Sequence, residues 1–161
     1  MRVATIGVYG FTAETFLAAL DDAGVGRVVD VRQRRGVRGP EYAWANSKRL
    51  QAALAEAELG YEHRPELAPT TELRELQYAE DSRRGEGKRS RTELAPEYVR
   101  RYTEEILDPA DVDALAESLA GGAPAALLCV ERDPEACHRS LIAARLEAEH
   151  GFAVTSLRPA G

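Results

Sequence analysis

The sequence has little cysteine and no long apolar run. Two cysteines among 161 residues exclude a disulfide scaffold. No apolar segment approaches the roughly eighteen residues that a membrane-spanning helix needs. The apolar start, MRVATIGVYGF, is too short and too interrupted by glycine for a signal peptide. We therefore expect a cytoplasmic protein without membrane contact, in which both thiols are reduced.

Positive charge and the standard nucleotide motifs are also scarce. The formal net charge is −6, with 21 Lys and Arg against 27 Asp and Glu. This balance argues against a general affinity for nucleic acid, although local basic clusters can still contact phosphate. The phosphate-cradling glycine loop, the dinucleotide fingerprint and the glycine-flanked catalytic serine are absent. The sequence does not set the oligomeric state.

Short apolar segments alternate with amphipathic ones along the whole chain. The alternation predicts one α/β domain over residues 1–161, with three layers, a mostly parallel sheet of about five strands and helices on both faces. An irregular basic insertion is expected at about 68–95. Strands are expected at 2–9, 27–32, 61–67, from 125 through Cys129, and at 153–157.

In such sheets, ligands bind beyond the carboxyl ends of the strands. Applied to this chain, the rule brings four segments to one edge of the sheet. They are Tyr9 to Phe11, Arg32 to Arg38, the residues from Glu66 onward, and Glu131 to Arg139. Three of the four are rich in charged or reactive side chains, which predicts a site at this edge.

The stretch from Ala125 to Leu146, AALLCVERDPEACHRSLIAARL, contains both cysteines. Asp133 followed by Pro134 is typical of a helix start. A helix from Pro134 puts Cys137 and His138 at the end of its first turn, where the partial positive charge of the helix favours a thiolate. Cys129 is expected to be a small core residue within its strand.

A metal site is the alternative for the same stretch. Cys129, Glu131, Asp133, Cys137 and His138 are all residue types that ligate ions. Their spacing matches no standard zinc pattern, and the chain has no second cysteine pair. The expectation is therefore no metal and no other cofactor.

Two basic loops and two aromatic residues leave alternatives open. The stretch DSRRGEGKRSR at 81–91 is either a solvated loop or a lid over an anionic ligand. Tyr42 and Trp44 follow the first basic loop, and they either stack on a base or pin the loop to the protein. Asp30, inside an apolar run, requires a partner, either Arg32 or a ligand.

Three motifs together resemble a known family. They are TIG near the start, VVDVR at 28–32 and CVERDPEACHRSLIA at 129–143. In order and spacing they are similar to the domain of unknown function 488 family. The resemblance implies a small α/β protein with shared polar residues, but no settled activity. The implied shared set is Asp30, Arg32, Cys129, Glu131, Asp133, Cys137, His138 and Arg139.

The chain departs from the family pattern after its first strand. Many members resemble TIGHS there, whereas this chain has Gly7, Val8 and Tyr9. The His-Ser pair that ends TIGHS is therefore missing from this chain, and any role of that pair is lost or passes to Tyr9. The architecture also resembles rhodanese-type sulfurtransferases and cysteine phosphatases. Their catalytic loop of five to seven residues is not present, because Cys137 lies two residues before Arg139. Likeness of fold does not confer function.

Three functions remain open from the sequence. The first is an enzyme acting on a phosphorylated, nucleotide-like or sulfur-containing anion, with catalytic Cys137, His138 and Glu131. The second is a non-catalytic module for a nucleotide, or for nucleic acid through the basic loops. The third is an interaction protein in which the Cys-His-Arg motif is structural. The expected ligand contacts of the first are Asp30, Arg32, Arg139, Tyr9, Asp133 and Arg38.

Overall fold

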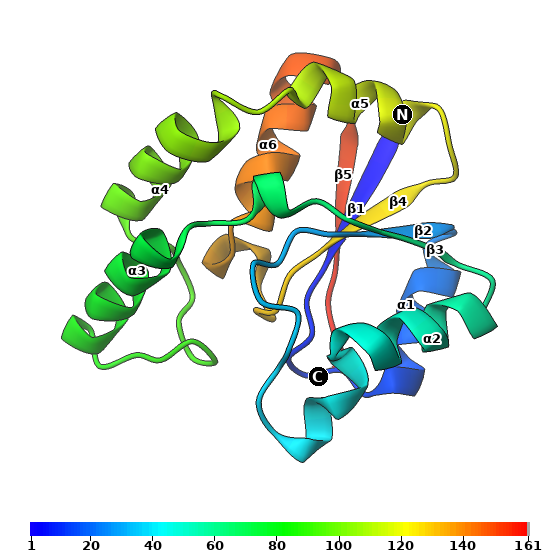
Figure 1. The fold of residues 1–161 in the computed structure, drawn as a ribbon, viewed down its shortest axis with the longest axis horizontal. Coiled ribbons are helices and arrows are strands. Elements are labelled where there is room, and N and C mark those ends of the chain that lie inside the picture. The colour runs from blue at the N-terminus through cyan, green and yellow to red at the C-terminus, as the bar shows by residue number, and fades with distance from the viewer. Residues whose placement is uncertain (161) are drawn as a thin grey trace.

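A computed structural model describes residues 1–160 and contains one five-stranded sheet in the order β3–β2–β4–β1–β5 (Figure 1). All of its strand pairings are parallel, which confirms the predicted α/β class. The strands are β1 (Arg2–Ile6), β2 (Arg27–Asp30), β3 (Gly60–His63), β4 (Ala125–Leu128) and β5 (Ala153–Leu157).

Helices cover both faces of the sheet. α1 (Ala13–Asp22) and α2 (Ser47–Glu56) lie together on one side in Figure 1, and α5 (Val112–Ala120) and α6 (Arg139–His150) lie on the other. This distribution follows from right-handed crossovers between parallel strands. α3 (Thr71–Arg83) packs against α4 (Pro96–Tyr102), which continues as a π-helical turn, Thr103–Leu107. Short 3-10 turns occupy Pro40–Ala45, Pro65–Leu67 and Pro134–Ala136.

The sheet is buried because its central strands have no polar face. Leu127 and Leu128 are fully buried on β4, as expected for a parallel strand covered on both sides. Phe16 and Leu20 of α1 and Ile142 of α6 are fully buried as well. No helix within residues 1–160 is long and apolar enough to cross a membrane.

Sheet order places the carboxyl end of β4 at a crevice. The chain leaves β1 and β2 toward the α1 and α2 side, whereas it leaves β4 toward α6 (Figure 1). β4 therefore lies between two strands whose connections run to the opposite face. Such a switch point is where open parallel sheets bind ligands. Cys129 and the segment that follows it leave the sheet at this switch point.

The start of α6 differs from the prediction. Pro134–Ala136 forms one 3-10 turn, Cys137 is extended (φ −139°, ψ 147°), and α6 begins at Arg139. Asp133 does not cap a helix, because its carboxylate receives a hydrogen bond of 2.5 Å from Arg158. The expectation that Cys137 and His138 lie in the first turn of a helix from Pro134 is therefore wrong. β4 also ends at Leu128, so Cys129 lies just beyond the strand.

Gly7 sets how closely β1 approaches the loop after β4. A Cβ atom at Gly7 would lie 2.0 Å from the backbone oxygen of Glu131. We expect Gly7→Ala to lower the free energy of unfolding by about 3 kcal/mol, the upper end of typical overpacking costs, because backbone must move. Gly87→Ala is the control, since beyond its chain neighbours no described residue has an atom within 4 Å of the added Cβ. Urea unfolding of both variants is the measurement, and equal stabilities would contradict the prediction.

Candidate functional site

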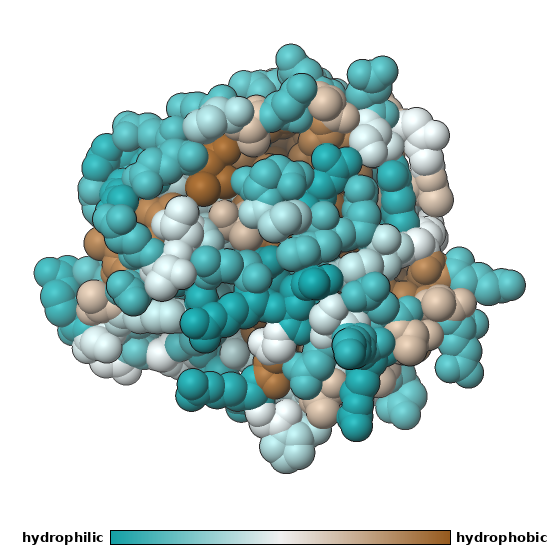
Figure 2. Space-filling view, in the orientation of Figure 1, coloured by the Kyte–Doolittle hydropathy of each residue, from teal (hydrophilic) through white to brown (hydrophobic). Residues whose placement is uncertain are grey.

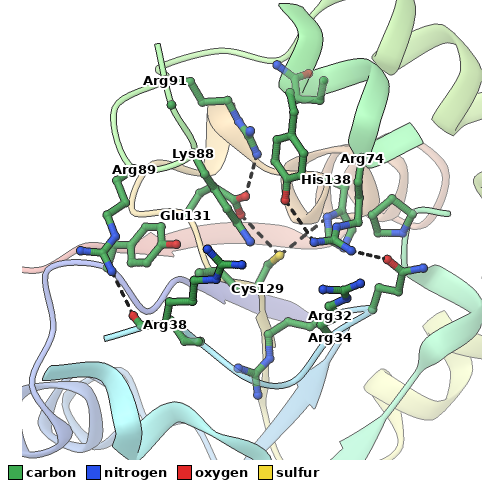
Figure 3. A pocket seen from close by; sticks show the side chains of 18 of the residues that line it. Arg32, Arg34, Arg38, Arg74, Lys88, Arg89, Arg91, Cys129, Glu131 and His138 are labelled. Carbon is green, nitrogen blue, oxygen red and sulfur yellow. Dashed lines mark hydrogen bonds and ion pairs between the residues drawn. The ribbon is translucent and has the colours of Figure 1, made fainter. Parts of the chain in front are cut away.

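A cavity of about 640 Å³ opens at the carboxyl edge of the sheet (Figure 3). Its walls come from the segments after β1, β2 and β4, from α3 and from the loop 84–95 that follows α3. The four segments that the sheet-edge rule predicted all reach the wall, the one from Glu66 onward through Pro69, and the loop 84–95 was not among them. The charged and reactive lining residues are Arg32, Arg34, Arg38, Arg74, Lys88, Arg89, Arg91, Cys129, Glu131 and His138.

Positive charge dominates this wall. Within residues 1–160, seven lysine and arginine side chains line the cavity, and Glu131 is the one carboxylate that does so. The excess contrasts with the net charge of −6 for the chain. Three of the seven are neutralised locally: Arg32 pairs with Asp30, Arg89 with Glu41, and Arg91 with Asp81 and Glu131.

The other four cations have no carboxylate partner within 4.0 Å in the described part of the chain. They are Arg34, Arg38, Arg74 and Lys88. Arg74 donates to the neutral side chains of Gln33 and Tyr78, at 2.8 and 3.1 Å. Burial lowers the pKa of Lys88, but the nearby charge of Glu131 and the neighbouring Tyr78 raise it further than burial lowers it. Lys88 is therefore a cation at neutral pH.

The inner end of the cavity meets a cluster of two thiols and an imidazole. Nδ1 of His138 lies 3.7 Å from Sγ of Cys129 and 3.8 Å from Sγ of Cys137. Nε2 of His138 lies 2.8 Å from the backbone oxygen of Val31. Cys129 and His138 line the cavity, whereas Cys137 lies behind them, 1% exposed. Figure 3 shows Cys129 between Glu131 and His138.

The environment shifts the pKa values of this cluster in opposite directions. Burial raises the pKa of the Cys129 thiol well above its usual value. Burial also opposes ionisation of Cys137, but hydrogen bonding to Cys129 and the charges of His138 and Arg139 lower its pKa well below the usual value. Burial lowers the pKa of His138, and the charge of Cys137 raises it overall. Burial raises the pKa of Glu131.

Two arginines expected to clamp the anion are instead engaged with the protein. Arg139 is fully buried, is not on the cavity wall, and donates to the backbone oxygens of Glu131 and Arg132 at 2.7 and 3.2 Å. Arg32 touches the cavity, but its guanidinium holds Asp30 at 2.8 and 2.9 Å and the backbone oxygen of Ala45 at 2.9 Å. Asp30 is fully buried away from the cavity, so its partner is Arg32.

The remaining predicted ligand contacts divide between the cavity and the surface. Tyr9 and Arg38 line the cavity. Asp133 does not, because it pairs with Arg158 outside it. The site therefore unites Tyr9, Arg32, Arg38, Glu131 and His138 of the predicted set. It leaves out Asp30, Asp133, Cys137 and Arg139 as direct wall residues.

The loop 84–95 folds over the cavity and is fixed there by Arg91. Its guanidinium bonds to Asp81 at 2.8 Å, to Glu131 at 2.6 Å and to the backbone oxygen of Ala136 at 3.0 Å. The guanidinium of Arg89 lies over the rings of Tyr9 and Tyr42, 5.1 and 5.2 Å from their centroids. Both side chains therefore tie the basic stretch to the rim of the cavity.

The aromatic residues expected near the first basic loop contact protein. Tyr42 packs against Tyr9 at 5.3 Å and accepts a hydrogen bond from the backbone of Gly10. Trp44 packs against Phe16 at 5.0 Å. These contacts favour the alternative in which both rings hold the loop in place.

Hydrophilic residues cover most of the face seen in Figure 2, and smaller apolar patches interrupt them.

Arg74 is the contributor that the sequence did not suggest. It lies on α3, among ordinary helical polar residues, and only its position opposite the strand ends brings it to the cavity. Arg34 and Lys88 belong to the two basic loops, and clustered charge was their signal. The sequence groups Cys129 with Cys137 only as part of a possible metal set, which is set aside there because their eight-residue spacing fits no standard motif.

The fold and site define a parallel α/β protein with a cationic cavity above a Cys-His cluster. The model of the family described as domain of unknown function DUF488 matches residues 12–146, and the chain belongs to this family. The TIG motif lies before the matched range. No curated protein and no solved structure matches the chain.

Proposed function

We propose that the cavity binds a small phosphorylated or nucleotide-like anion and that the Cys-His cluster at its inner end is the chemical centre of an enzyme. One observation carries the proposal: four cationic side chains that have no carboxylate partner within residues 1–160 line a cavity in an acidic chain. Because the four side chains line one cavity, their charges act on the same space. A cavity with several cationic donors favours an anion that can accept several hydrogen bonds.

The size and placement of the cavity support a small molecule as ligand. Its volume of about 640 Å³ lies within the range usual for small-molecule sites. Arg34 and Arg38 lie on the segment after β2, whereas Arg74 and Lys88 come from α3 and the loop 84–95. A ligand between these two groups is contacted from both sides, as a phosphate chain requires.

The residues at the inner end support chemistry on that ligand. Cys129, Glu131 and His138 all line the cavity, so a bound anion lies next to a thiol, a carboxylic acid and an imidazole. The carboxylic acid and the imidazole are usual groups for proton transfer, and the thiol attacks an electrophile once one of them has removed its proton. Sγ of Cys129 and Oε2 of Glu131 are 3.5 Å apart, which lets both face one reacting group.

Isothermal titration calorimetry tests ligand binding. We expect inorganic pyrophosphate and adenosine diphosphate to bind the full chain at low ionic strength and to bind less tightly as salt is added, because salt screens the charges. Adenosine, which lacks phosphate, is the matched control and is expected to bind at least tenfold more weakly than adenosine diphosphate. Equal binding of the two, or no binding of either anion, would overturn the proposal.

A further inference from the structure

We propose that Cys129, Cys137 and His138 bind one divalent metal ion of the zinc type. The inference rests on the geometry of these three side chains and goes beyond the anion-binding proposal, so either can hold without the other. The three ligating atoms, two sulfurs and Nδ1, all lie within 4.8 Å of one another. Thiolate sulfur and imidazole nitrogen are the ligands that zinc prefers.

The spacing of the three atoms fits tetrahedral coordination. Zinc–sulfur and zinc–nitrogen bonds of about 2.3 and 2.0 Å separate neighbouring ligand atoms in a tetrahedron by about 3.5–3.8 Å. The two sulfur–nitrogen separations in this chain are 3.7 and 3.8 Å. The two sulfurs are at most 4.8 Å apart, so an ion fits at the centre of the cluster once they stand about 3.8 Å from each other.

The hydrogen bond of His138 prepares its ring for this role. A backbone oxygen can only accept, so the 2.8 Å contact with Val31 requires a proton on Nε2 of His138. Nδ1 is then the nitrogen directed at both sulfurs. Metal-ligating histidines typically donate their other N–H group to a carbonyl or carboxylate in this way. The ring of Tyr102, 5.5 Å away between centroids, packs against the imidazole.

The backbone holds the cluster from two separate segments. Cys129 follows β4, and its backbone N–H donates to the oxygen of Ile6 at the end of β1. Cys137 is extended between the Pro134–Ala136 turn and α6, and this conformation rather than a helical turn brings its sulfur to Cys129. All three side chains are at least nine-tenths buried. A buried cluster on such fixed elements loses little entropy when an ion binds.

The cluster is incomplete on the side that faces the cavity. Three protein ligands leave a fourth tetrahedral position, and Cys129 and His138 line the cavity while Cys137 lies behind them. The open position therefore points toward the cavity, close to Glu131. Catalytic zinc sites have three protein ligands and keep the fourth position for water or substrate. A phosphate oxygen of a bound anion suits that position.

Cobalt(II) binding to the full chain is the test. We expect one Co²⁺ per chain, thiolate-to-cobalt charge-transfer absorption from two sulfurs, and the strong visible bands of a tetrahedral site. Added Zn²⁺ is expected to abolish the spectrum and to slow the reaction of both thiols with a disulfide reagent. Cys129→Ser, Cys137→Ser and His138→Gln should each weaken Co²⁺ binding by more than the roughly 10–100-fold caused by second-shell changes.

His150→Gln is the matched control, because His150 lies at the far end of α6 and pairs with Asp113. It should leave the cobalt spectrum unchanged. Absence of charge-transfer bands in the wild-type chain, with both thiols kept reduced throughout, overturns the proposal. Bands from a single sulfur also overturn it, even if the variants fail to fold. Failure of pyrophosphate to bind leaves the cobalt result untouched, which keeps the two proposals distinguishable.

Discussion

Replacing Arg74 and Lys88 together by glutamine is expected to weaken pyrophosphate binding about a hundredfold or more. The two side chains come from α3 and from the loop after it, and neither has a carboxylate partner within 4.0 Å among the residues that the structure describes. A hydrogen bond to a charged group contributes about 1.5–3 kcal/mol, so losing two costs at least about 3 kcal/mol. Each 1.4 kcal/mol corresponds to about a tenfold change in affinity.

The control for this double variant carries the same change of charge elsewhere. Lys48 and Arg49 are exposed on α2 and do not line the cavity, so replacing both by glutamine removes two cations at a distance. We expect the affinity of this control to stay within about threefold of wild type at 0.15 M salt, where exposed charges are screened beyond about 8 Å. Similar losses in both double variants would show that net charge, rather than the cavity, controls binding.

Asp30→Asn is expected to lower the free energy of unfolding by about 3–5 kcal/mol. Both partners of the Asp30–Arg32 pair are buried, with side chains 0% and 1% exposed. The carboxylate also accepts hydrogen bonds from the backbone of Arg32 at 3.2 Å and from Tyr61 at 2.6 Å. The substitution leaves a buried guanidinium without a counter-charge, which is the costly way to break a buried ion pair.

A second variant separates the charge from the loss of hydrogen bonds. Asp30→Asn combined with Arg32→Met removes both charges, and we expect it to recover a substantial part of the stability, because no unpaired ion remains. Urea unfolding of the wild type and both variants measures the difference. A loss below about 1 kcal/mol in Asp30→Asn would contradict the structural role of the pair.

The sheet and the location of the site could be predicted from the sequence because they depend on periodicity and on a general rule. Apolar segments such as 27–32 and 125–128 are recognisable without knowledge of their partners. Once the strands are parallel, their carboxyl ends meet at one edge. Tyr9, Arg38 and Glu131 reach the cavity for this reason.

Side-chain roles could not be predicted in the same way, because tertiary contacts decide them. Arg139 looks like an anion ligand in sequence, yet the backbone oxygens of Glu131 and Arg132 occupy its guanidinium. The pairing of Asp133 with Arg158, 25 residues away, replaces the expected helix cap. Cys137 then adopts an extended backbone, and its sulfur joins Cys129 instead of facing the ligand. No local pattern contains this information.

A crystal structure of the full chain with pyrophosphate is the most direct test of the proposed anion cavity. The account predicts an ordered pyrophosphate inside the cavity, with phosphate oxygens within about 3 Å of the nitrogens of Lys88 and of at least one of Arg34, Arg38 and Arg74. A phosphate group is expected beside Cys129 and Glu131 at the inner end. A cavity without the anion at saturating pyrophosphate, or an anion ordered only elsewhere, would contradict the central claim.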